Sequence, residues 1–133
     1  MILDTSAVIA LLFEEPEADG FYRLIQDADI CRMSVANYLE VTMVLERLAG
    51  TDANRRCELF FHRAGIVLEP VTLEQGYLAR QAFFEFGKGR HSAGLNFGDC
   101  FAYALSKVCR EPLLFKGEDF RKTDLELASS VQM

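Results

Sequence analysis

Several features are absent from this 133-residue sequence, and each absence excludes a class of protein. No apolar run approaches the roughly 20 residues that a membrane-spanning helix needs. The stretch MILDTSAVIALLF has neither the basic segment nor the small-residue cleavage site of a signal peptide. We therefore expect a cytoplasmic protein with no membrane partner.

Paired cysteine motifs are also missing. The four cysteines, Cys31, Cys57, Cys100 and Cys109, include no C-x-x-C pair and no spacing typical of metal ligands. We interpret them as reduced, mostly buried thiols, as is usual in a cytosolic protein. A zinc site is not expected.

A basic excess is lacking as well, since the formal net charge is −6 and the pI is about 4.9. Taken alone, this charge argues against simple electrostatic binding of nucleic acid. The argument changes if several acids are clustered ligands of divalent cations. Four such carboxylates would hold −4 of the −6, and two bound dications would cancel that charge.

Apolar runs separated by helical patterns predict an α/β fold. The runs ILDT, ICRM, GIVLEPV and PLLFK indicate strands, and LELAS indicates a short fifth. Helical patterns cover residues 6–13, 15–29, 35–49, 52–64, 73–86 and the segment around Asp99. Ser34 and Thr72 are expected caps, and Gly50 an expected helix end. We predict one domain, residues 1–133, with a central, mainly parallel sheet of four to five strands flanked by helices on both faces.

Three acids fall at the same edge of this predicted sheet. Asp4 ends the first strand, and Asp119 lies three residues past the fourth. Asp99 stands where a loop leads into a helix, so its side chain can point back toward that edge. Ligands of open α/β sheets bind beyond the carboxyl ends of the strands, which makes this edge the expected site.

Glu40 is a fourth candidate, on the helix predicted for residues 35–49. At 100° per residue, Val41, Val44, Leu45 and Leu48 form an apolar stripe, and Glu40 lies on its flank. Asn37 lies inside the stripe and needs a polar partner. Both side chains can therefore reach a cleft at the edge of the core.

Each acid also has an ordinary structural interpretation. Asp4 could cap the following helix, Asp99 could be a helix-start charge, and Asp119 could be a turn residue. Glu40 could be a solvated charge on a helix flank. The interpretations are not independent, because like charges gathered without a cation are unfavourable. If the fold gathers these acids, hard oxygen ligands of this kind suit Mg²⁺ or Mn²⁺.

Four blocks of the sequence resemble PIN-domain ribonucleases, and most closely the VapC-type toxins of bacterial toxin–antitoxin pairs. The blocks are MILDTSAVIA, SVANYLEV, GRHSAGLNFGDCFAYALS and LLFKGEDFRKTDL, in the expected order. The resemblance implies a PIN-like fold, a Mg²⁺- or Mn²⁺-dependent endoribonuclease and a small VapB-like antitoxin as partner. It also implies a homodimer. The helical segments FYRLI, YLEVTMVL and CELFF carry apolar residues beyond the needs of one small core, which suits such contacts.

The resemblance also implies roles for individual residues. Asp4, Glu40, Asp99 and Asp119 would form the acidic metal site, with Asp4 and Asp99 as direct ligands. Supporting positions are Thr5, Ser6 and Asn37, with Asp124 as a further acid near the rim. Metal-assisted hydrolysis does not use the 2′-hydroxyl of RNA, so the products should carry a 5′-phosphate and a 3′-hydroxyl.

Basic residues flank the acidic edge and could guide a phosphate chain toward it. The candidates for RNA contact are Lys88, Arg90, His91, Lys116, Arg121 and Lys122. The rival ribonuclease chemistry uses paired general acids and bases, often histidines. We do not expect it here, because His62 belongs to a helical segment and His91 to a basic loop.

Two other functions compete with the nuclease. A phosphatase of the haloacid-dehalogenase type needs a second aspartate two residues after the first, and Ser6 stands in that place. A non-catalytic PIN-like module that binds RNA or protein is the other alternative. The intact set of four acids argues against it.

Overall fold

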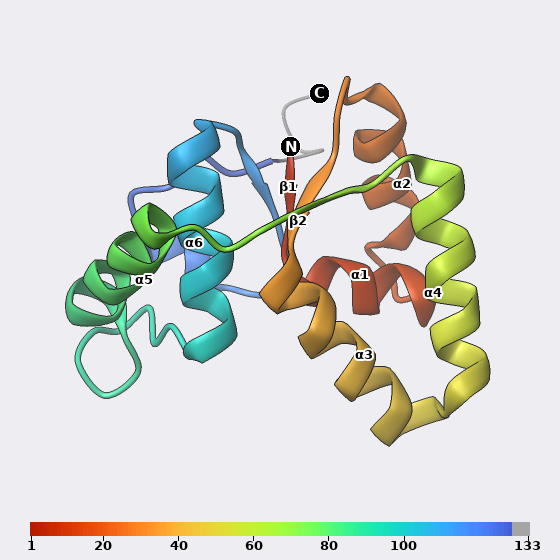
Figure 1. The fold of residues 1–133 in the computed structure, drawn as a ribbon, viewed down its shortest axis with the longest axis horizontal. Helices are drawn as coiled ribbons and strands as arrows, with labels where there is room; N and C mark the ends of the chain where they lie inside the picture. The colour runs from red at the N-terminus through yellow and green to blue at the C-terminus, as the bar shows by residue number, and fades with distance from the viewer. Residues whose placement is uncertain (129–133) are drawn as a thin grey trace.

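The computed structural model describes residues 1–128, in which four short strands form one sheet and six α-helices flank it (Figure 1). The strands are β1 (Ile2–Leu3), β2 (Arg32–Ser34), β3 (Val67–Glu69) and β4 (Leu113–Leu114). The helices are α1 (Thr5–Leu12), α2 (Ala18–Asp27), α3 (Val35–Ala49), α4 (Thr51–Ala64), α5 (Leu73–Phe86) and α6 (Phe97–Cys109), and a 3₁₀ helix, η1 (Asp119–Lys122), follows β4. The predicted order of elements is confirmed, although α2 begins only after Pro16.

The sheet is parallel throughout, with the strand order β3-β2-β1-β4. Ile2 pairs with Arg32 on one side and with Leu113 on the other. The predicted fifth strand is wrong for the described residues, since Leu127 makes only an isolated bridge to Leu113. Ser129, the last residue of that prediction, lies outside the described residues.

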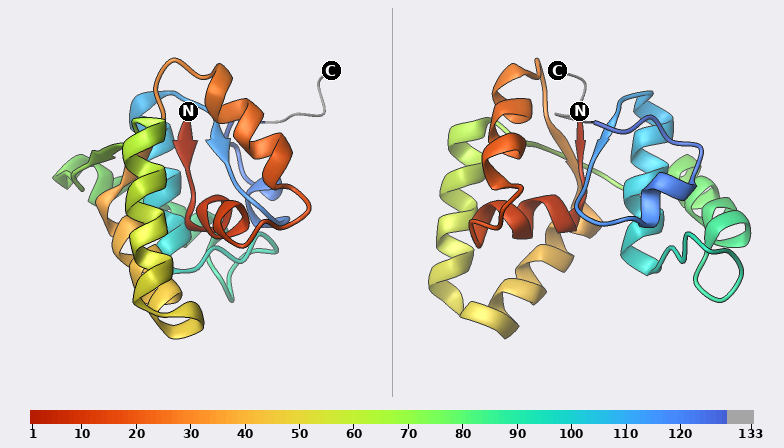
Figure 2. Two further views of the ribbon diagram at one scale, coloured as in Figure 1. Left: turned by 90° about the vertical axis from the view of Figure 1, so that its right-hand side faces the viewer. Right: turned by 180° about the vertical axis from the view of Figure 1, so that it is seen from behind.

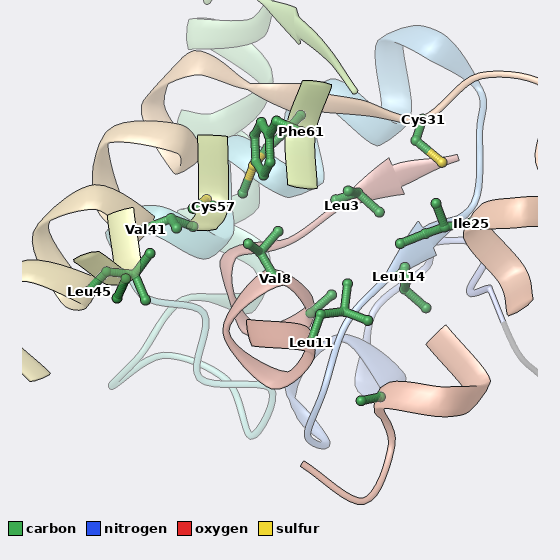
Figure 3. Packing of buried hydrophobic residues seen from close by; sticks show 14 residues of the cluster. Leu3, Val8, Leu11, Ile25, Cys31, Val41, Leu45, Cys57, Phe61 and Leu114 are labelled. Atoms are coloured by element: carbon green, nitrogen blue, oxygen red, sulfur yellow. The ribbon is translucent and has the colours of Figure 1, made fainter. Parts of the chain in front are cut away.

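Alternation along the strands gives the sheet two apolar faces. Ile2 and Leu113 belong to a core cluster with residues of α5 and α6, whereas Leu3 and Leu114 belong to a cluster with residues of α1 to α4. Figure 2 shows these two groups of helices on opposite sides of the sheet. Figure 3 shows the second cluster, in which Val8 lies among residues of the sheet and of the surrounding helices. Helices therefore cover both faces, as predicted.

Local signals explain where several helices begin and end. The Ser34 hydroxyl accepts a hydrogen bond from the Ala36 N–H at the start of α3, and Thr72 does the same for Gln75 at the start of α5. Gly50 ends α3 at a φ of 81°, a left-handed conformation that favours glycine. The apolar stripe of α3 is narrower than predicted, because Leu48 is exposed.

The carboxyl edge of the sheet is the meeting point of several elements. The chain leaves β1 into α1, β2 into α3 and β4 toward η1, and α6 begins near the same edge (Figure 1). After β1 the chain places β2 and β3 on one side, and it later places β4 on the other. The edge beside β1 and β4 is thus a switch in strand order, where open α/β sheets bind ligands.

Two expectations from composition can be checked directly. Among residues 1–128, no helix combines the length and the apolar character needed to cross a membrane. All four cysteines are free thiols; Cys31, Cys57 and Cys100 are buried and Cys109 is half-buried. The prediction that the cysteines are mostly buried is therefore confirmed.

Candidate active site

Asp4 stands directly after β1 and is the N-cap of α1. Its Oδ2 accepts hydrogen bonds from the Ser6 backbone N–H at 3.0 Å and from the Ser6 hydroxyl at 2.6 Å. Its backbone N–H donates to the carbonyl of Leu114, which fixes the residue to the end of β4. The side chain is buried, and its second oxygen, Oδ1, has no hydrogen-bond partner. A buried carboxylate oxygen without a partner is unfavourable unless a ligand satisfies it.

Glu40 reaches the same edge from the second turn of α3. The Thr5 hydroxyl donates to its Oε1, and the side-chain amide of Asn37 donates to the same oxygen at 3.3 Å. The Asn37 amide also donates to the carbonyl of Gly98 at 2.9 Å. Hydrogen bonds from α1 and α3 therefore hold this carboxylate beside the first turn of α6.

Asp99 lies in that first turn of α6 and is half-buried. It forms a capping box with Asn96: the Asp99 N–H donates to Asn96 Oδ1 at 2.9 Å, and the Asn96 N–H donates to Asp99 Oδ2 at 3.0 Å. Both the backbone and the side chain of Asp99 are thus fixed by the start of the helix.

Asp119 approaches from the other side of β1, as the first residue of η1 after β4. Its side chain is exposed, unlike those of Asp4 and Asp99. It lies near enough to Asp99 for its charge to act on that carboxyl group. Four acids from four separate segments therefore converge on one edge.

The electrostatics reflect this crowding. Burial raises the pKa of Asp99 to about 7, against a hydrogen bond from Asn96 that lowers it. The charges of Asp4, Asp119 and Glu40 also contribute to this rise, and the value of about 7 includes them. Burial also raises the pKa of Asp4, the hydrogen bonds from Ser6 oppose that rise, and the Glu40 charge adds to it. The site is therefore short of positive charge.

The donor set fits a hard divalent cation. It consists of carboxylate oxygens, and the partnerless Oδ1 of buried Asp4 is an acceptor that a cation could satisfy. Within residues 1–128, no three His, Cys, Asp or Glu side chains stand close enough together to hold an ion as they are.

Comparison with known proteins agrees with this arrangement. A profile of the PIN domain matches residues 1–126. The chain belongs to the PIN domain family. It is 47% identical over 125 residues to Ribonuclease VapC30 of Mycobacterium tuberculosis, covering 94% of this chain and 95% of that one. The resemblance to VapC-type PIN domains is thereby confirmed.

Solved structures with low sequence identity share the PIN fold. The crystal structure of VapC20 from M. tuberculosis, a toxin that cleaves the sarcin-ricin loop, superposes with a TM-score of 0.76 at 18% identity, covering 96% of this chain and 97% of that one. A toxin–antitoxin complex from Klebsiella pneumoniae gives 0.72 at 15% identity, with 96% and 95% covered. These two likenesses support the fold alone.

The supporting residues predicted for this PIN domain separate into two groups. Thr5, Ser6 and Asn37 all contact the acids at the sheet edge. Asp124 does not join them: its carboxylate accepts from the Tyr103 hydroxyl at 2.7 Å and from Lys107 Nζ at 2.6 Å, farther along α6. The structure thus places it in a separate ion pair.

The basic candidates are partly engaged within the protein. Lys116 Nζ lies 2.9 Å from Glu15 and 3.3 Å from Glu17, so it holds the turn before α2. The Arg90 guanidinium lies over the rings of Phe83 and Phe84. The other four candidates also divide: Arg121 pairs with Glu118, His91 Nδ1 accepts from the Ala93 N–H, and Lys88 and Lys122 are exposed.

Two residues of the site escaped the sequence analysis. Asn96 could have been found, because asparagine followed three residues later by an acid is a capping signal before an apolar helix. Gly98 gives no such signal, since its proximity to Glu40 depends on how α3 packs against α6.

Proposed function

We propose that this PIN domain is the toxin of a toxin–antitoxin pair, an endoribonuclease that hydrolyses RNA with the help of Mg²⁺ or Mn²⁺. The convergence of Asp4, Glu40, Asp99 and Asp119 around one unsatisfied buried oxygen carries the proposal. The curated relative VapC30 is a ribonuclease, which agrees with it. We also propose that residues 1–133 form a single domain.

The four acids would divide the work of holding the cation. Asp4 offers Oδ1, and Asp99 offers the oxygen that its capping box leaves available, so both suit direct coordination. Glu40 and Asp119 would orient water molecules, complete the shell or hold a second ion. A bound Mg²⁺ or Mn²⁺ lowers the pKa of a water and neutralises phosphoryl oxygens. The products would carry a 5′-phosphate and a 3′-hydroxyl, because the 2′-hydroxyl takes no part.

A histidine mechanism finds no support in the geometry. His62 is an exposed residue in the last turn of α4, and no hydrogen bond or ion pair joins it to an acid of the site. His91 donates no side-chain hydrogen bond to an acid of the site; its Nδ1 accepts from the backbone of its own loop. The arrangement therefore supplies no pair of imidazoles for attack by the 2′-hydroxyl.

Substrate approach would depend on local positive charge in an acidic protein. Lys88 and Lys122 are exposed, and Arg90 presents its guanidinium on an aromatic surface. Single-stranded RNA binds proteins through such cations and through stacking of its bases on aromatic or guanidinium planes. We propose these residues as RNA contacts, and Lys116 and Arg121 as residues that mainly shape the edge.

An antitoxin would bind a groove between α1, α2 and α4. This groove has a volume of about 650 Å³, and its lining includes Leu11, Tyr22, Ile25, Phe60, Arg56 and Arg63. The apolar segments FYRLI and CELFF meet here. A groove that combines apolar side chains with two arginines suits an amphipathic helix that carries acidic residues. The K. pneumoniae structure is a toxin–antitoxin complex, which fits the proposal of an antitoxin as partner.

A second copy of the chain would cover the exposed apolar residues of α3 and of the start of α6. Phe97 is 82% exposed, Met43 63% and Leu39 58%. Large apolar side chains grouped in this way mark interaction surfaces. We propose this face as the homodimer contact. Light scattering at micromolar concentration tests it: a monomer that copurifies with no partner would contradict both surfaces.

RNA cleavage by the purified protein tests the nuclease. We expect Mn²⁺-dependent cutting that EDTA abolishes, that Asp99→Asn lacks and that Asp52→Asn retains. Asp52 is a matched control, because it is also a first-turn acid of a helix but is 91% exposed on α4. Mapping of the new ends should show 5′-phosphates. RNA binding without cutting by the wild type would instead favour a non-catalytic module.

A further inference from the structure

Gly98, the second residue of α6, has an unusual neighbour. A Cβ atom at this position would lie 2.6 Å from Glu40 Cδ and closer still to both carboxylate oxygens. Real Cβ atoms essentially never approach another heavy atom within 3.0 Å. Any residue other than glycine would therefore displace the Glu40 carboxylate.

The backbone does not explain this glycine. Gly98 has no positive φ and lies inside a helix, where alanine is the more favourable residue by about 1 kcal/mol. Gly76 in α5 makes the contrast clear, because a Cβ there would meet nothing within 4 Å. The requirement for glycine at position 98 therefore comes from the carboxylate of Glu40.

The seat of the Glu40 carboxylate consists of the residues that surround it, Gly98, Thr5 and Asn37. Asn37 lies on the same helix as Glu40, α3. It is fully buried, and its side-chain amide donates both to Glu40 Oε1 at 3.3 Å and to the Gly98 carbonyl at 2.9 Å. One amide group thus ties the carboxylate to the backbone of α6. The Thr5 hydroxyl closes the seat from α1.

We infer that Gly98 and Asn37 are positioning residues that hold the Glu40 carboxylate beside Asp99, ready to serve the divalent cation. The inference rests on the proposed metal site and adds the residues that set its geometry. Glu40 is a long side chain with several rotamers, so without a seat its carboxylate would spend much of its time in solvent. Residues that orient a ligand in this way commonly change metal affinity by 10- to 100-fold when they are replaced.

Gly98→Ala and Gly76→Ala form a matched pair for the test. In EDTA, Gly98→Ala should melt no lower than the wild type, because the displaced group is the flexible end of a side chain and alanine favours the helix. Its affinity for Mn²⁺, measured by calorimetric titration, should fall at least tenfold. Gly76→Ala should keep the wild-type affinity.

A double-mutant cycle separates positioning from a general structural effect. Shortening the acid, Glu40→Asp, should weaken Mn²⁺ binding by the wild type. In the Gly98→Ala background it should cause no further loss, because the carboxylate has already left its seat. Independent, additive losses would overturn the inference, and so would wild-type Mn²⁺ affinity in Gly98→Ala.

Asn37→Ala gives a second reading of the same seat. It should also reduce Mn²⁺ affinity, and unchanged affinity would overturn the role of Asn37. Suppose that the wild type cuts RNA and binds Mn²⁺, and that Gly98→Ala binds Mn²⁺ equally well. That result would refute only this inference. A wild type that neither binds Mn²⁺ nor cuts RNA would refute the proposed function as well.

Discussion

Replacing Asp99 with asparagine should raise the melting temperature of the metal-free protein at pH 8. Burial and three neighbouring acids raise the pKa of Asp99 from 3.8 to about 7. At pH 8 the carboxyl group is therefore ionised in an environment that disfavours its charge. Asparagine removes the charge, and its side-chain oxygen can still accept the hydrogen bond from the Asn96 N–H.

The magnitude follows from linkage between protonation and folding. The folded protein keeps a proton on Asp99 that the unfolded chain releases near pH 3.8. The contribution of this proton to the free energy of unfolding therefore falls as the pH rises from about 4, and it is fully lost above about pH 7. At about 1.4 kcal/mol per pKa unit, the loss is at most about 4 kcal/mol. Because Asp99 is partly exposed, screening reduces this to roughly 1–2 kcal/mol.

Asparagine also has a cost, which must be subtracted. An acid in the first turn of a helix stabilises it by about 0.3–1 kcal/mol, and the amide loses that contribution. The net gain should be on the order of 1 kcal/mol at pH 8, or roughly 3–5 °C for a domain of this size. At pH 4 the gain should vanish, since Asp99 is then protonated in the folded protein.

Thermal melts with EDTA and with Mn²⁺ provide the assay. A ligand that binds only the folded state stabilises it by about 2.7 kcal/mol at 100-fold excess over Kd. Mn²⁺ should therefore raise the melting temperature of the wild type well above that of Asp99→Asn, which reverses the order seen in EDTA. Asp52→Asn, which changes an exposed first-turn acid, reports the helix contribution together with a weak exposed ion pair to Arg55, and it should melt slightly lower in both conditions.

The opposite pattern would refute the reasoning. If Asp99 were only a helix-start charge, Asp99→Asn would behave like Asp52→Asn and melt lower with or without metal. If Mn²⁺ did not change the melting temperature of the wild type, the neighbouring carboxylates would not share a bound ion. Together these results would leave four unrelated acids at the edge of the sheet.

The remaining predictions concern the cell and the assembly. Expression of the chain alone should arrest growth, and Asp4→Asn should relieve the arrest at equal protein level, because it removes a metal-binding charge while nearly preserving shape; equal toxicity of both would contradict a metal nuclease. Replacing Met43 with serine should weaken self-association, seen by light scattering as a shift toward monomer, because it adds a hydroxyl to an apolar contact. The same variant should keep its Mn²⁺ affinity.

The fold was largely predictable because its signals are local. Ser34 and Gly50 bound α3 at the residues expected from capping preferences. The prediction of a fifth strand was wrong because it rested on a short apolar run, of which only Leu127 pairs with β4, through an isolated bridge. Short apolar runs carry too little information to decide whether the backbone continues to pair.

The positions of the acids at the site could be predicted from the sequence, but the residues that contact them were harder to predict. Strand ends meet at one edge in a parallel sheet, so Asp4 and Asp119 could be placed together from topology. The position of Asp124 could not, because its partners Tyr103 and Lys107 lie one and two turns beyond Asp99 on α6. The contact between Gly98 and Glu40 depends on the crossing of two helices, which no local pattern encodes.

The ordinary and the functional interpretations of these acids turn out to be compatible. Asp4 does cap α1, and Asp99 does form a capping box. Each cap fixes one carboxylate oxygen on backbone N–H groups and so restricts the direction of the other. The positive end of each helix also compensates part of the negative charge while no cation is bound. Two of the four acids, Asp4 and Asp99, therefore also begin helices, which helps a cluster of acids to exist in a folded protein of net charge −6.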